Sequence, residues 1–261
     1  MEKLKFDEML NAGVHFGHLK RKWNPSMAPY VFDERKGIHI IDLNKTVVKA
    51  EEAAEAMKQI AKSGRKILFV ATKKQAQTIV AEKVGETNMP FITERWPGGM
   101  LTNFKTTRKT IRKMTSIEKM MQDGTANHLS KRERLQRTRQ KDKLAKVFGA
   151  VADMTRLPAA LFIVDIKKEE IAVLEAKKLG IPIFAMVDTN SDPKPVDFVI
   201  PANDDASKSI ELVVGYVCGA VKEGLAERKA GKVKAAEEKA SKKEEKVEAK
   251  AETKVEETTK K

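Results

Sequence analysis

The chain has 261 residues with 41% hydrophobic content, which is enough to bury a full α/β core and leave an appendage over. Its longest wholly apolar run, residues 159–164, is far shorter than the roughly 20 residues of a membrane-spanning helix. The single cysteine, Cys218, lies in an apolar helical pattern, which indicates packing in a reducing compartment. A formal net charge of +14 then favours nucleic acid over lipid as a partner. Because the first ten residues lack the features of a signal or transit peptide, we expect a cytoplasmic protein.

Residues 1–45 are predicted to form an addition in front of the core. A short amphipathic helix is expected at residues 4–12, followed by a loop at residues 16–23 that combines aromatic rings with three consecutive basic side chains. Extended residues at 30–32 and 38–41, with a turn between them, indicate a small β-hairpin.

Residues 46–104 and 149–228 are predicted to form two parts of one α/β domain. Short apolar strands alternate with helices in both parts, a pattern typical of a parallel sheet covered on both faces. We expect strands at residues 67–71, 90–93, 160–165, 183–187 and 198–200, and helices at residues 45–63, 74–84, 169–179 and 206–225. Right-handed crossovers favour a doubly wound topology.

A basic segment, residues 105–148, interrupts this alternation and is called the basic arm below. The stretch from Lys105 to Lys146 contains fourteen Lys or Arg residues against four acidic ones, so it carries +10 of the net charge, and this stretch has no Phe, Trp or Tyr. Its first half predicts an amphipathic helix with Ile111, Met114 and Ile117 on one face. Residues 124–127 predict a turn, and residues 130–147 predict a second helix. We therefore expect a protruding helical, coiled-coil-like hairpin.

Such a charge density indicates a polyanionic partner, and phosphate backbone is the commonest one. Without aromatic side chains on which bases stack, the arm is expected to recognise RNA mainly by shape. The predicted RNA-binding residues are Lys20, Arg21, Lys22, Arg95, Lys105, Arg108, Lys109, Arg112, Lys113, Arg132, Arg134, Arg137 and Arg139. The alternative is a solvated coiled coil that binds another protein. Residues 229–261, rich in Lys, Glu and Ala, are expected to be a disordered tail with a net charge of only +3.

Neither of the two common glycine-rich phosphate-binding motifs occurs, and the turn after the first core strand, Ala71–Lys74, has no glycine. No catalytic residue, cofactor or small-molecule substrate is predicted, although a nucleotide or phosphate-ester enzyme on this fold stays open as an alternative. Several aspartates fall near predicted strand ends, where capping and turn closure are favoured over a divalent cation site with His15 or His18. These aspartates are Asp165, Asp188, Asp192, Asp204 and Asp205.

The loop Arg95–Gly99 has two interpretations. Its two glycines let the backbone approach a partner or adopt positive φ, and its place beside the basic arm can present Arg95 and Trp96 to nucleic acid. Equally, Trp96 can pack inside the protein and the glycines can serve only as a turn.

The sequence resembles the bacterial ribosomal protein S2 family. The resemblance spans about residues 6–225, and several motifs occur in collinear order. These motifs are Ala12–His18, Trp23–Pro25, Gly37–Leu43, Phe69–Gln75, Arg95–Phe104, Leu157–Pro158 through Ile181–Pro182, Val187–Pro193 and Ile200–Asp205.

The resemblance implies a flavodoxin-like α/β domain with an inserted helical hairpin and no enzymatic activity. It also implies a structural role in the small ribosomal subunit, with contacts to small-subunit rRNA and to neighbouring ribosomal proteins. One implied neighbour is the mRNA-binding ribosomal protein S1, for which the family provides a docking surface. The expected location is therefore the cytoplasm, bound to the ribosome.

Overall fold

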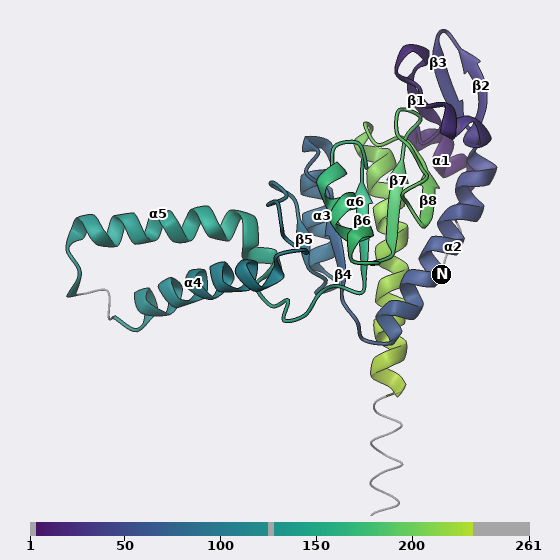
Figure 1. The fold of residues 1–261 in the computed structure, drawn as a ribbon. Coiled ribbons are helices and arrows are strands. Elements are labelled where there is room, and N and C mark those ends of the chain that lie inside the picture. Colours follow the sequence, from purple (N-terminus) through teal and green to yellow (C-terminus); the bar gives the residue numbers. More distant parts are fainter. Residues whose placement is uncertain (1–3, 125–127, 232–261) are drawn as a thin grey trace, which may run out of the picture.

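The described part of the chain forms two β-sheets, a basic arm and a long C-terminal helix (Figure 1). The computed structural model describes residues 4–124 and 128–231. Most of the expected tail, residues 232–261, and most of the expected turn of the arm, residues 125–127, lie outside the described residues. No helix in the described ranges is both long enough and apolar enough to cross a membrane.

The larger sheet has five parallel strands in the spatial order β5-β4-β6-β7-β8. The strands are β4 (Ile67–Val70), β5 (Phe91–Ile92), β6 (Ala160–Val164), β7 (Ile183–Val187) and β8 (Phe198–Pro201). Counted along the chain, this order is 2-1-3-4-5, which is the flavodoxin-like doubly wound arrangement. The expected fold class is therefore confirmed.

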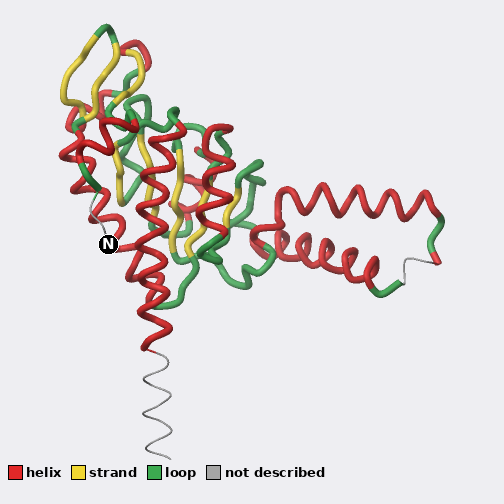
Figure 2. The backbone as a smooth tube through the Cα atoms, turned by 180° about the vertical axis from the view of Figure 1, so that it is seen from behind, coloured by secondary structure: helices red, strands yellow, loops and turns green. Residues whose placement is uncertain are grey.

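The strands are continuously apolar because helices cover both faces of this sheet (Figures 1 and 2). Phe69, Phe162 and Phe184 pack on one face, and Leu68 and Leu161 pack on the other. The first face is covered by α2 (Leu43–Lys62), α3 (Lys74–Gly85) and the helix at residues 207–231, and the second by α6 (Glu170–Lys178). Alternate residues of each strand thus enter two separate cores.

The start of α2 and the end of the last helix differ from the expected bounds. Helix α2 begins at Leu43, with the side chain of Asp42 accepting a hydrogen bond from the backbone N–H of Asn44, so the boundary expected at residue 45 falls inside a helix. The last helix continues from residue 207 through residue 231, beyond the end expected at residue 225. The continuation, Ala226–Ala230, consists of good helix-forming residues after the apolar positions end.

The smaller sheet is antiparallel, with the order β1-β3-β2, and follows helix α1 (Phe6–Ala12). The strands β2 (Val31–Arg35) and β3 (Ile38–Ile41) form the expected hairpin. Strand β1 (Phe16–Leu19) was expected to be a loop, and its pairing with β3 corrects that prediction. The four residues of β1 do not alternate between apolar and polar, so the sequence contains no strand signal there. They form a strand because the backbone of β3 has a free edge with which they pair.

The N-terminal segment is attached where the parallel strands end. The backbone N–H of Asn24 donates to the carbonyl of Thr189, 2.9 Å away, just beyond β7. The backbone N–H of Asn203, just beyond β8, donates to the carbonyl of Val14 at 3.1 Å. The small sheet therefore sits over the carboxyl edge of β7 and β8, the edge at which doubly wound folds bind ligands.

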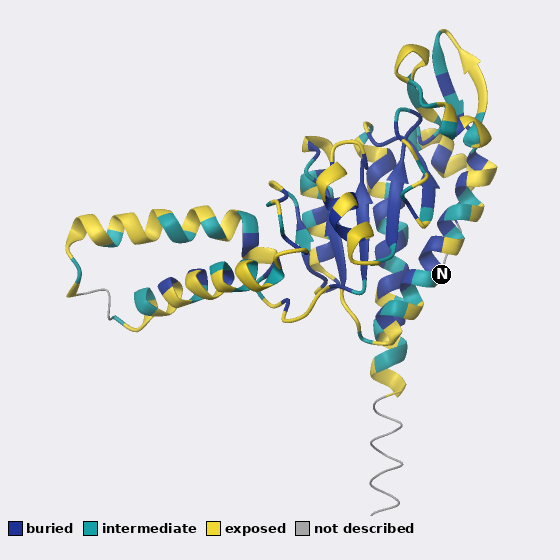
Figure 3. Cartoon of the chain, in the orientation of Figure 1, coloured by how far each residue is buried: buried dark blue, intermediate teal, exposed yellow. Residues whose placement is uncertain are grey.

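The basic arm lies between β5 and β6 in the chain and consists of α4 (Phe104–Gln122) and α5 (Lys131–Phe148). The two helices lie against each other and extend away from the parallel sheet (Figure 1). Most of their surface is exposed, whereas the strands of the body are buried (Figure 3).

Candidate nucleic-acid interface

Helix α4 has one buried face and one basic face. Ile111, Met114 and Ile117 are buried at the spacing that places residues on one side of a helix. The basic side chains between them point outward because the apolar face is fixed against the protein. Those exposed in α4 are Lys105, Lys109, Arg112, Lys113 and Lys119.

Helix α5 begins with a capping box: the Ser130 hydroxyl accepts from the backbone N–H of Glu133, and the Glu133 carboxylate accepts from the N–H of Ser130. The helix has a single buried residue, Phe148, at its end. Arg132, Arg137 and Arg139 are exposed and Arg134 is half-buried. A helix with so little buried surface presents charge along most of its length.

Arg108 differs from the other predicted RNA-binding residues. It is half-buried, and its guanidinium donates to the backbone carbonyl of Met154 at 3.0 Å. This contact joins the base of α4 to the segment that leads into β6. Arg108 therefore has a structural partner inside the protein.

The basic residues near the N-terminus lie far from the arm. Lys20, Arg21 and Lys22 form a single 3-10 turn after β1, and all three are exposed. Lys20 forms an ion pair with Glu34, with 2.7 Å between Nζ and Oε2. The small sheet and the arm stand at opposite ends of the molecule (Figure 1), so the predicted RNA-binding residues form two groups.

The loop between β5 and α4 is organised from inside the protein. Trp96 is only 7% exposed, and its indole N–H donates to Glu175 on α6. Of the two interpretations of this loop, packing inside the protein is the one that the structure shows for Trp96, because the side chain is buried with its one polar atom paired. Arg95, the residue before it, is exposed.

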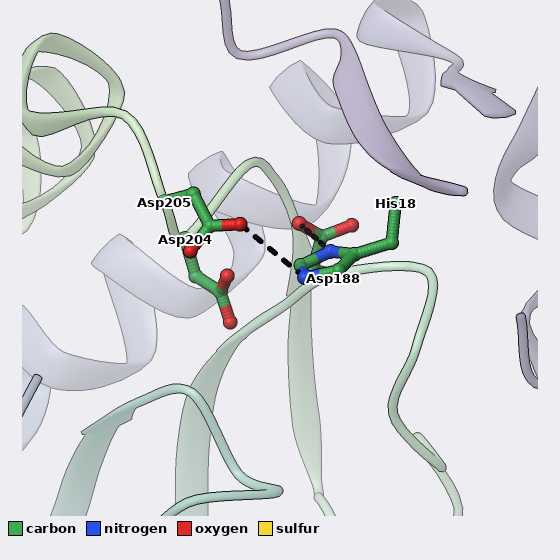
Figure 4. Close-up of side chains that lie close together, drawn as sticks. All are labelled: His18, Asp188, Asp204 and Asp205. Carbon is green, nitrogen blue, oxygen red and sulfur yellow. Dashed lines mark hydrogen bonds and ion pairs between the residues drawn. The ribbon is translucent and has the colours of Figure 1, made fainter. Parts of the chain in front are cut away.

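His18 and three aspartates converge at the carboxyl edge of the sheet (Figure 4). His18 Nδ1 lies 2.9 Å from Asp188 Oδ2, and His18 Nε2 lies 3.2 Å from Asp205 Oδ2. One ligand atom from each of His18, Asp188, Asp204 and Asp205 falls within 4.8 Å of the others. The hydrogen bond to Asp188, opposed by partial burial, raises the pKa of His18. An imidazole with carboxylates is a donor set that can hold a divalent cation.

Lys73 closes the same edge next to β4. Its ammonium lies 2.7 Å from Asp204 Oδ1, 2.6 Å from Asp205 Oδ1 and 3.6 Å from Asp165 Oδ2. Burial lowers the pKa of Lys73, but the carboxylates outweigh burial and the net shift is upward. The place where related folds hold a ligand phosphate is therefore filled by an internal ion-pair cluster.

The aspartates divide into two kinds. The expected turn-closing role is confirmed for Asp165, which accepts from the N–H groups of Lys167 and Lys168, and for Asp192, which accepts from that of Lys194. Asp188 instead pairs with His18, and Asp204 and Asp205 pair with Lys73, to which Asp165 also lies within ion-pair distance. The expected packing or hydrogen bonding of the first two histidines is also confirmed, because His15 packs on Phe16 with 4.0 Å between ring centroids.

Sequence reasoning missed two residues of this region, Glu175 and Lys73. Glu175 follows Ala172 by three positions and precedes Ala176, so it lies on the buried face of α6, and this spacing was a usable signal. Lys73 gave no comparable signal, because its partner Asp204 lies 131 positions further along the chain.

The fold and the arm define a class: flavodoxin-like α/β proteins with a basic helical insertion between the second and third strands of the parallel sheet. Residues 9–224 match the family model described as ribosomal protein S2. The chain therefore belongs to the ribosomal protein S2 family.

Relatives named small ribosomal subunit protein uS2 are similar over most of their length. The relative from Phocaeicola vulgatus is 66% identical over 233 residues, which cover 89% of this chain and 84% of the relative. The relative from Flavobacterium johnsoniae is 66% identical over 237 residues, covering 90% of this chain and 93% of the relative. The relative from Parabacteroides distasonis is 64% identical over 240 residues, covering 91% and 86%.

Proposed function

We propose that this protein is a non-enzymatic structural constituent of the small ribosomal subunit, acting in the cytoplasm, and that its basic arm binds small-subunit rRNA. Family membership and the names of the relatives support the ribosomal role. The observation that carries the RNA contact is the exposed row of Lys and Arg side chains on α4 and α5. Arg pairs with phosphate in a bidentate manner, and Lys acts as a point charge.

The internal ion-pair cluster argues against the alternative of a nucleotide or phosphate-ester enzyme. Thr72 and Lys73, which follow β4, are committed to contacts within the protein: Thr72 donates its N–H to Glu169 at 3.0 Å, and Lys73 pairs with Asp204. A loop without glycine, whose Thr72 N–H and Lys73 ammonium already have partners inside the protein, is poorly suited to wrap around a phosphate.

The RNA contact is tested by the salt dependence of binding to full-length small-subunit rRNA. We expect the triple variant Arg132→Ala, Arg137→Ala, Arg139→Ala to lower the slope of log affinity against log salt by about 2 to 3, since each phosphate contact contributes roughly 0.7 to 0.9.

The matched control removes three exposed lysines of the body, in Lys74→Ala, Lys178→Ala, Lys208→Ala. We expect the control to leave the slope within about 0.5 of the wild-type value. Equal slopes for the two triple variants would contradict a specific role of the arm and would favour the alternative of a coiled coil that binds another protein.

We further propose that the N-terminal segment helps to dock the mRNA-binding ribosomal protein S1. An exposed apolar patch supports this assignment: Phe32 is 73% exposed, and Phe6 and Leu10 lie beside it around a groove of about 270 Å³. Contiguous patches of exposed apolar side chains are uncommon on monomeric proteins, and such patches often mark interaction surfaces.

The docking is tested by binding of purified S1 to the purified protein. We expect Phe32→Ala to weaken binding by about tenfold, as removal of an aromatic anchor does at other interfaces. The control is Leu174→Ala, which removes an apolar side chain of similar exposure from α6. If Leu174→Ala weakens binding and Phe32→Ala does not, the docking surface lies on α6 instead.

A further inference from the structure

The carboxylate of Glu175 accepts hydrogen bonds from several residues of the loop that joins β5 to the basic arm. Oε1 accepts from the indole N–H of Trp96 at 3.1 Å and from the backbone N–H of Gly99 at 2.7 Å. Oε2 accepts from the backbone N–H groups of Leu101 and Thr102, both at 2.9 Å, and from the Thr102 hydroxyl at 3.0 Å. Five donors from seven consecutive residues therefore converge on one side chain of another element.

The surroundings of Glu175 keep it charged without a cation. It is 7% exposed, and in the described part of the chain the groups that hydrogen-bond to it are all uncharged donors. Burial raises its pKa, but the donated hydrogen bonds outweigh burial, and the pKa lies below the ordinary value. Convergent backbone N–H groups form an anion-binding nest, and here the anion belongs to the protein itself.

The nest determines where the arm begins. Gly99 has φ +80°, a conformation that favours glycine and turns its N–H toward the carboxylate. Met100 and Leu101 enter the core beside α6, and the N–H of Asn103 donates to the carbonyl of Gly99 at 2.9 Å. Phe104, the next residue, starts α4. The start of the arm is thus only two residues from Thr102, which Glu175 holds with two hydrogen bonds.

We propose that Glu175 is a positioning residue that sets the orientation of the basic arm and of Arg95 through this nest. This inference rests on the proposed contact between the arm and rRNA. Glu175 itself faces the interior and touches no RNA. It acts by fixing the loop from which α4 extends, so a small change of angle at the loop is magnified at the far end of a 19-residue helix.

The test is chemical rescue of the variant Glu175→Ala, which removes the carboxylate and leaves space for a small anion. Without RNA, we expect the amides of Gly99, Leu101 and Thr102 to exchange with deuterium at least tenfold faster than in the wild type. Acetate should restore slow exchange, while acetamide, or chloride at the same ionic strength, should not. With rRNA, the salt slope of binding should fall by about 1 to 2, and acetate should restore it.

Two further variants keep the result interpretable. Glu170→Ala removes an exposed carboxylate from the same helix, and we expect both readouts to stay at wild-type values. Glu175→Gln keeps the side-chain volume, so it serves if the alanine variant does not fold. We expect it to lose both protection and slope, and acetate should not restore them because the site is filled.

Three results would overturn the inference. Unchanged amide exchange in Glu175→Ala would show that the carboxylate does not hold the nest. Faster exchange with an unchanged salt slope would show that the loop does not orient the arm. If acetamide restores slow exchange in Glu175→Ala as well as acetate does, then filling the space is sufficient and the negative charge of the carboxylate plays no part. A wild-type protein whose rRNA binding does not depend on salt would instead contradict the proposed function, and the exchange measurement would still report on the nest.

Discussion

At the scale of single residues, the surroundings of a buried ionisable group decide which form it takes. Cys218 is buried among apolar side chains, and desolvation raises the pKa of its thiol to about 12. Glu175 is buried among hydrogen-bond donors, and its pKa falls. Burial therefore gives an inert thiol at one position, whereas donated hydrogen bonds keep a charged carboxylate at the other.

The lowered pKa of Glu175 predicts a pH-dependent contribution to stability. A carboxyl whose pKa is lower in the folded than in the unfolded protein stabilises the fold above the unfolded value of about 4.3. That stability is lost as the pH falls through the folded pKa. We expect Glu175→Gln to lower the free energy of unfolding by about 2 kcal/mol at pH 7, with a smaller difference from wild type below about pH 4. Urea unfolding at several pH values measures this, and a loss independent of pH would show that the charge plays no part.

The raised pKa of Cys218 predicts a thiol that does not react in the folded protein. A thiol reagent at pH 8 attacks the thiolate, which is scarce when the pKa is about 12 and inaccessible when the residue is 2% exposed. We expect labelling of native protein to be at least about 100-fold slower than labelling in concentrated urea. Comparable rates in the two conditions would mean that the C-terminal helix opens readily.

At the scale of elements, the C-terminal helix packs closely on α2. Lys58 of α2 forms ion pairs with Glu223 at 3.3 Å and Glu227 at 2.9 Å. Between these carboxylates lies Gly224, where an added Cβ would collide with the backbone carbonyl of Lys58. Glycine is needed at this crossing because the two backbones approach too closely for a side chain.

Two glycines of the C-terminal helix should therefore respond differently to alanine. We expect Gly224→Ala to lower the free energy of unfolding by about 2 kcal/mol, the cost of forcing extra atoms into a packed contact. An added Cβ at Gly219 meets no atom within 4 Å, so Gly219→Ala should raise stability by roughly 0.5 kcal/mol through reduced freedom of the unfolded chain. Urea unfolding compares the two. Similar effects of both substitutions would contradict the close crossing.

At the scale of the whole molecule, basic groups at two ends suggest two contacts on one RNA. Residues 20–22 lie beyond the carboxyl edge of β7 and β8, and the arm extends from the β5 side of the sheet (Figure 1). Substitutions at distant sites without shared partners contribute additively to a binding free energy.

We therefore expect the losses from Arg21→Ala, Lys22→Ala and from Arg137→Ala, Arg139→Ala to add within about 0.5 kcal/mol when both pairs are combined. Binding to intact small-subunit rRNA at fixed salt measures the effect. An N-terminal pair without effect would restrict the RNA contact to the arm.

Deleting the arm is a poorer experiment than changing its charges. Ile111 and Met114 belong to the core on the α6 side of the sheet, so removing residues 105–146 would open that core. Loss of ribosome binding after such a deletion would combine misfolding with lost phosphate contacts.

The sequence alone determined the elements of the α/β domain and of the basic arm, and their order. Continuous apolar runs such as Ala160–Val164 predict buried parallel strands, and the spacing of Ile111, Met114 and Ile117 predicts an amphipathic helix, because both signals come from residues close together in the chain. The charge of the arm and the lack of a glycine-rich phosphate loop are also local properties. Motifs in collinear order then indicated the family, and the family match bears this out.

Only the tertiary structure decided which distant residues meet. Strand β1 depends on an edge supplied by β3, Lys73 on carboxylates more than ninety positions away, and the loop before the arm on Glu175 more than seventy positions away. Such contacts come from the packing of complete elements, so no local periodicity encodes them. The sequence therefore determined what the arm is made of, whereas the fold decided how the loop at its base is held.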